Sequence, residues 1–148
     1  MNASPAIVLI VEGVRLVSQL GEIRAARRLG EGVAGLLGEW RLRREEWWDR
    51  LVALEASGVR VGLVEVARRL VLSDVELDLV LVVLAPHVDP ELLSALVDRE
   101  GEFYFRGITV DLLLGLLFHT SEDRLVARQD LFGGSPLFRM HLLELVPL

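Results

Sequence analysis

The sequence has 148 residues but no cysteine and no lysine, and these two absences exclude several kinds of chemistry. Without cysteine there are no disulfides and no thiolate metal sites, and nothing requires an oxidising compartment. All 16 basic residues are arginine. The chain by itself therefore has no amine for a Schiff base and no lysine for a phosphate-binding loop of the G-x-x-x-x-G-K-[ST] type.

Long apolar runs and strong positive charge are also missing. The run from Ala6 to Val11 is too short to span a bilayer, and no basic residue precedes it as in a signal peptide. Residues 1–60 hold nine arginines against eight acids (+1), and residues 61–148 hold seven against fourteen (−7), which gives the net charge of −6. Such acidity disfavours nucleic acids and anionic membranes. We expect a cytoplasmic protein that binds neither.

The sequence offers no clear catalytic, metal or cofactor site. His87, His119 and His141 are far apart and match no zinc-binding spacing. Residues 30–35, GEGVAG, match G-x-G-x-x-G, but the preceding IRAARRL is a charged helical pattern and not the strand that dinucleotide binding requires. The glycines here are better explained as helix breaks or close helix contacts, and they are Gly30, Gly32, Gly35 and Gly38. We therefore predict a protein that is not an enzyme and has no cofactor and no metal.

The stretch Leu63–Asp89 predicts two helices joined by a tight turn. Apolar residues recur at helical spacing in LVEVARRL, which indicates a half-buried helix. Ser73 and Glu76 form a capping box that starts a second helix, and every residue from Leu79 to Ala85 is apolar. We expect this second helix to be the centre of the core and to end before Pro86.

This pair is a helix-turn-helix arrangement, whose second helix often lies in the DNA major groove. Reading bases and contacting phosphates needs arginine, lysine, asparagine or glutamine on the presented face. The second helix instead carries three carboxylates, Asp74, Glu76 and Asp78, and no cation from Asp74 to Ala85. We therefore predict that it does not bind DNA.

Serine and threonine residues mark the starts of further helices. Ser4 precedes Pro5, Thr109 precedes a helix to about Phe118, Thr120 or Ser121 starts a helix to about Arg128, and Ser135 precedes Pro136. Asp89-Pro90 opens a short helix to about Asp98. The first helix has an apolar stripe that needs a partner, either its own domain or a second copy, and we expect self-association through this stripe. The stripe comprises Ile7, Ile10, Val14, Val17 and Leu20, of which the first four are the candidate contact residues.

A second helical pattern runs from about Glu39 to Gly58, where the glycine is a plausible stop. Trp40, Trp47, Leu51 and Leu54 share one face, which is typical of a core stripe. Trp48 points elsewhere. Together with nearby arginines it forms a candidate contact surface, since tryptophan and arginine are enriched at interfaces; the alternative is a solvated arginine cluster. The candidate residues are Trp40, Arg41, Arg43, Arg44 and Trp48.

Four runs together resemble the winged-helix domain that precedes the motor in a group of bacterial AAA+ ATPases, some of them encoded beside contractile injection systems. The runs are LVLSDVELDLVLVVLAPHVDPELLSALVD, ITVDLLLGLL, SEDRLVARQDL and SPLFRMHLLELV. The resemblance covers about residues 45–148, and its most specific parts are L-S-x-x-E-x-D-L, A-P-x-x-D-P and the closing L-L-E-L. It implies a regulatory or docking module whose motor domain is not in this chain.

We therefore predict a mainly α fold: a winged-helix-like domain over residues 45–148 and a helical extension over residues 1–44. EFYFRG at 102–107 is a loop or short strand, and HLLELV at 141–146 suits a small C-terminal β element. The predicted function is non-catalytic docking of a protein partner, an AAA+ motor in the same or another chain, with a homo-oligomer expected. The alternatives are a transcription regulator that binds DNA through the basic region 24–44, and an enzyme fragment or small-molecule-binding domain with a deep polar pocket.

Overall fold

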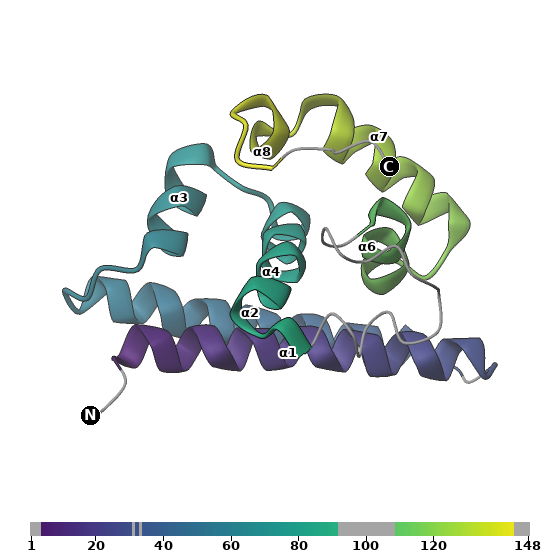
Figure 1. The fold of residues 1–148 in the computed structure, drawn as a ribbon, viewed down its shortest axis with the longest axis horizontal. Helices are drawn as coiled ribbons and strands as arrows, with labels where there is room; N and C mark the ends of the chain where they lie inside the picture. Colours follow the sequence, from purple (N-terminus) through teal and green to yellow (C-terminus); the bar gives the residue numbers. More distant parts are fainter. Residues whose placement is uncertain (1–3, 31, 33, 92–108, 144–148) are drawn as a thin grey trace.

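The computed structural model describes residues 4–30, 32, 34–91 and 109–143. Helices α1 and α2 lie side by side as an antiparallel pair, and α4 stands across them between α3 and α6 (Figure 1). Helices α7 and α8 cover the opposite side of α4 and α6. The helices are α1 (Pro5–Arg28), α2 (Ala34–Ala56), α3 (Gly62–Leu70), α4 (Asp74–Val88), α6 (Val110–Leu117), α7 (Ser121–Gly134) and α8 (Pro136–Arg139).

Side-chain caps start five of these helices, α1, α4, α6, α7 and α8, where the sequence predicts them. The Ser4 hydroxyl accepts the amide of Ile7, and Thr109 and Thr120 cap α6 and α7 in the same way. Ser73 and Glu76 form the predicted capping box at α4. Each such cap satisfies an amide that has no acceptor within its helix. The local sequence therefore defines the starts of these five helices.

Helix α4 is the centre of the core, as predicted. Its buried side chains pack with those of α1 and α6 in one hydrophobic cluster. The helix does not end before Pro86 as expected, because it continues through that proline to Val88. The buried residues of α4 are Leu77, Asp78, Leu79, Leu81, Val82 and Ala85.

Two tryptophans of α2 fasten it to α1. The indole Nε1 of Trp40 donates to the carbonyl oxygen of Leu16 at 2.7 Å, and that of Trp47 donates to the carbonyl oxygen of Leu9 at 2.6 Å. Both tryptophans are buried. Gly13 makes room for the Trp47 ring, since a Cβ atom there would lie 2.5 Å from it. The predicted core stripe of α2 is thus confirmed at Trp40, Trp47 and Leu51.

Helix α2 begins earlier than the sequence predicts. Gly35 and Gly38 lie inside it, and a Cβ atom added at either position would meet no other atom within 4 Å, so they neither break the helix nor admit a close contact. Gly30, with φ +81°, follows the end of α1. Gly58, with φ +105°, follows α2 and is the predicted stop. The expected boundary between residues 44 and 45 falls within α2.

The predicted C-terminal β element is wrong, because the described residues contain no strand. Residues 141–143 instead close the end of α8. His141 takes a left-handed conformation with φ +59°, and the amide of Leu142 donates to the carbonyl oxygen of Leu137. This arrangement caps the helix and occupies the amides that a strand would use. The predictions for residues 92–98, 102–107 and 144–146 lie outside the described residues.

Candidate functional site

The predicted N-terminal stripe lies mostly inside the molecule. Val14 and Val17 are buried, Ile10 is half-buried, and Ile7 is exposed. Helix α1 packs against α2, α4 and α6 of the same chain. The chain itself therefore covers most of the face on which the prediction of self-association was based, and a homo-oligomer stays a prediction.

The predicted tryptophan and arginine surface is divided by the fold. Trp40 is buried, and Trp48 is half-buried against the core. Arg41 and Arg43 are exposed, and they contact the carbonyl oxygen of Leu117 at 3.4 Å and the side chain of Gln19 at 3.3 Å. These side chains do not form one continuous contact surface.

Arg44, expected at a contact surface, is instead buried in an ion pair. It is 5% exposed, and its Nε lies 2.6 Å from Oδ1 of Asp78, which is also 5% exposed. Asp74, in the first turn of α4, lies 3.7 Å from Nη1 of Arg44. The pair joins the middle of α2 to the first half of α4. A charge buried this deeply is tolerated because its counter-charge is in direct contact.

Burial raises the pKa of Asp78 to about 6, and the guanidinium groups of Arg44 and Arg41 offset this effect only in part. A raised carboxylate pKa can mark a catalytic site when the group lies in a cleft. Asp78 lies in the interior between α2 and α4 and lines none of the described grooves. We therefore assign Asp78 a structural role.

A groove of about 570 Å³ lies between the start of α4, α7 and α8, and we call it the acidic groove. Val75 and Val126 are among its apolar side chains and are 37% and 55% exposed. Three acids and one arginine are also among the described residues that line it, and together they carry a charge of −2. The charged residues are Glu76, Asp123, Asp130 and Arg41.

One wall of the acidic groove is held by Glu76. Its Oε1 accepts the backbone amide of Ser73 at 3.1 Å, and its Oε2 accepts the hydroxyl of Ser135, the N-cap residue of α8. Burial alone would raise the pKa of Glu76, but the hydrogen bonds from Ser135 and Ser73 lower it overall. Glu76, the second residue of the α4 capping box, thus also holds Ser135 at the junction of α7 and α8.

The residues of the acidic groove were not predicted from the sequence. Asp123, Val126 and Asp130 recur at helical spacing, so an apolar side chain flanked by acids on one face of α7 was a detectable signal. No local signal joins Glu76 to Ser135, because 59 residues separate them. Their contact depends on the packing of α8 against α4.

Several arginines of the basic region 24–44 support the fold. Arg27 donates to the carbonyl oxygens of Phe118 at 3.0 Å and Gly115 at 3.1 Å, at the end of α6. Arg41 donates to Leu117 at the same end, and Arg44 pairs with Asp78. Since carbonyl groups at a helix end lack partners within the helix, arginines stabilise them. This internal use does not favour the DNA-binding alternative.

Two other kinds of site were sought in the described part of the chain. No three histidine, aspartate or glutamate side chains there come together in a way that could hold a metal ion. None of its helices is both long enough and apolar enough to cross a membrane.

Comparison with known families gives one match over most of the chain. A family model described as "Winged helix domain, variant" matches residues 14–147. The match begins inside α1, so it includes most of the predicted helical extension as well as the helix-turn-helix of α3 and α4. Neither curated proteins nor solved structures give a match.

Proposed function

The chain belongs to the variant winged-helix domain family, and from this premise we propose that it is a non-catalytic docking module for a protein partner. The observation that carries the proposal is the burial of α4, the second helix of the helix-turn-helix. A helix that fills the core has no long face left to lie in a DNA groove. The acidic groove beside its first turn is the surface that we propose for docking.

The chemistry of the acidic groove favours a basic, amphipathic segment. Exposed valines from α4 and α7 offer apolar contacts, and Asp123 and Asp130 lie at the α7 side. A partner helix with apolar residues on one face and arginine or lysine beside them would complement this pattern. The groove is open rather than deep, and the hydrogen bonds to Glu76 in its wall lower the pKa of that carboxylate, which argues against a small-molecule active site.

We further propose that the partner is an AAA+ motor, in a longer form of this chain or in a separate chain. The support is the sequence resemblance of residues 45–148 to the domains that precede such motors. The chain has no phosphate-binding loop and no lysine, so ATP hydrolysis would belong to the partner. Here the module would position a substrate or an assembly for the motor.

The proposal is tested by measuring binding of this chain to the purified AAA+ ATPases of its source organism by titration calorimetry. Val126→Arg places a cation in the acidic groove and should weaken binding at least about tenfold, because it fills the apolar position and repels a basic partner. Leu42→Arg is the matched control, since Leu42 is 67% exposed on α2 and does not line the groove.

Binding that falls with added salt, is lost in Val126→Arg and is kept in Leu42→Arg would support the proposal. Equal binding by both variants would contradict the groove as the docking surface. Absence of binding to every AAA+ ATPase would contradict the motor as the partner.

A further inference from the structure

Two carboxylates of the acidic groove remain available to a partner. Asp123 and Asp130 are exposed, and within the described part of the chain neither carboxylate accepts a hydrogen bond or forms an ion pair. The third acid, Glu76, differs, because its two oxygens already accept the amide of Ser73 and the hydroxyl of Ser135. The cations of a basic partner would therefore be bound by Asp123 and Asp130.

Helix α7 sets the spacing of these two carboxylates. Asp123 and Asp130 are seven residues apart in one continuous helix, which places them on the same face and about 10.5 Å apart along the helix axis. Val126 and Ala127 lie between them at helical spacing and also line the groove. This face of α7 thus presents an acid, two apolar residues and a second acid over two turns.

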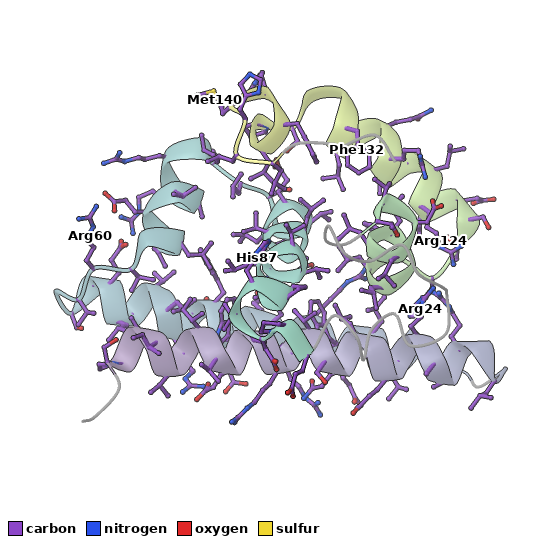
Figure 2. The ribbon with its side chains drawn as sticks, in the orientation of Figure 1. Arg24, Arg60, His87, Arg124, Phe132 and Met140 are labelled. Carbon is purple, nitrogen blue, oxygen red and sulfur yellow. The ribbon has the colours of Figure 1, made fainter. Side chains whose placement is uncertain are left out.

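The helix that carries the carboxylates is fixed to the rest of the domain. Ala127 and Leu131 are buried on its inner side. Phe132, which Figure 2 labels on α7, packs against Phe138 of α8 with the two ring centroids 5.0 Å apart. The distance between the two acids is therefore a fixed property of the groove, and a partner that is already helical can match it with little ordering.

Arg41 restricts where the cations of a partner can lie. It reaches the groove from α2 and donates to the carbonyl oxygen of Leu117 at 3.4 Å. A cation placed beside Arg41 would meet a like charge, whereas a cation placed along α7 would meet Asp123 or Asp130. The charges of the groove therefore direct the basic side of a partner toward α7.

We propose that the acidic groove selects a partner helix with two cations seven residues apart and apolar residues three and four positions after the first cation. Laid along α7, such a helix brings one lysine or arginine to each carboxylate and its apolar residues to Val126 and Val75. The pattern is the same in both chain directions, so it does not depend on the direction of the partner helix. This inference rests on the proposed docking function and adds the spacing by which the partner is recognised.

The test measures binding of two peptides to the full chain by titration calorimetry. Both are alanine- and glutamine-based and about 20 residues long, which is enough for helix formation. The matched peptide has lysine at i and i+7 and leucine at i+3 and i+4, and the shifted peptide exchanges the residues at i+4 and i+7. Composition and charge are thus identical. We expect the matched peptide to bind about fivefold more tightly, because the shifted peptide can pair with one carboxylate at a time.

Three variants show whether spacing or total charge is recognised. Asp123→Asn and Asp130→Asn should each weaken binding of the matched peptide about threefold, because each removes one ion pair. The shifted peptide should change by less than about twofold in either variant, because its one ion pair can form at the remaining carboxylate. Glu122→Gln is the matched control, since it removes the same charge from the first turn of α7 outside the groove, and it should leave both peptides within about twofold.

Equal affinity of the two peptides would overturn the proposed spacing. Equal losses in Asp123→Asn and Glu122→Gln would do the same, because attraction would then depend on total charge, as would absence of matched-peptide binding at about 1 millimolar. The docking proposal would survive these results as long as Val126→Arg still weakens binding of an AAA+ ATPase. Spacing-dependent peptide binding without any bound AAA+ ATPase would instead support the spacing and contradict the motor as the partner.

Discussion

The two faces of α7 carry side chains of opposite charge. Asp123 and Asp130 line the acidic groove toward α4 and α8, whereas Arg124 and Arg128 line a second groove toward α1 and α6, here called the arginine groove. Because successive residues of a helix lie about 100° apart, neighbours such as Asp123 and Arg124 face different sides. One helix of 14 residues thus presents two surfaces that the net charge of −6 does not reveal.

The two grooves also differ in what holds their walls. The α4 wall of the acidic groove is tied to α2 by the buried pair Arg44–Asp78. The arginine groove depends on half-buried arginines that donate to backbone carbonyl groups of α6. Since breaking a buried ion pair costs more than losing a partly exposed hydrogen bond, the acidic side should be the more sensitive to substitution.

The largest effect is expected at the buried pair. Arg44→Ala should lower the free energy of unfolding by about 3–5 kcal/mol, because it leaves Asp78 buried without a counter-charge. Urea denaturation at pH 7, followed by circular dichroism, measures it. Arg69→Ala, which breaks the exposed Arg69–Glu65 pair, should change the value by less than about 1 kcal/mol. Equal losses in the two variants would contradict the role of burial.

The free energy of unfolding should depend on pH because of the carboxylate of Asp78. The folded protein keeps the proton of Asp78 up to a pKa of about 6, whereas the unfolded chain releases it near the ordinary value of 3.8. The folded state thus binds more protons between these values, and stability from this group falls by about 1.4 kcal/mol per pH unit, roughly 3 kcal/mol in all. Above pH 6 the loss is complete.

Asp78→Asn removes this titration and is the control. The stability of the native chain minus that of Asp78→Asn should decrease from pH 4 to pH 6 and stay level from pH 7 to pH 8. A difference that instead increases over pH 4–6 would mean that Arg44 lowers the pKa of Asp78 below its ordinary value.

A change in the packing between α1 and α2 should alter the stability of the whole fold. Gly13→Ala should lower the unfolding free energy by about 1–3 kcal/mol, because the added methyl group meets the Trp47 ring. Gly38→Ala adds the same group at an exposed position of α2 with no neighbour within 4 Å, and it should stabilise the protein by about 0.5–1 kcal/mol. Thermal unfolding of both variants should show opposite shifts, and shifts of the same sign would contradict the packing at Gly13.

The smallest losses of stability are expected at two residues that each hold the wall of one groove. Ser135→Ala removes the α8 cap and the hydrogen bond to Glu76, and Arg124→Gln removes two donors to the end of α6. Each should cost about 1 kcal/mol. Hydrogen exchange should show faster opening of α8 in Ser135→Ala and of the end of α6 in Arg124→Gln. Faster exchange at both places in either variant would mean that the walls are coupled.

Local sequence patterns predicted the helices well because their causes lie within a few residues. Ser73 and Glu76 form a capping box whatever the rest of the chain does, and Gly58 permits a left-handed stop. The prediction of a β element failed because the amide of Leu142 is taken by Leu137, a contact made by α8. A left-handed histidine at 141, where glycine is usual, gives little warning of that turn.

The sequence by itself determined an all-round apolar second helix, the starts of most helices and an acidic surface, since these depend on composition and on neighbours in the chain. Only the tertiary structure decided that Arg44 would be buried against Asp78 and that the acids and the arginines of α7 would line two different grooves. Periodicity assigns a residue to a face of its helix, but which element covers that face depends on packing between segments far apart in the sequence.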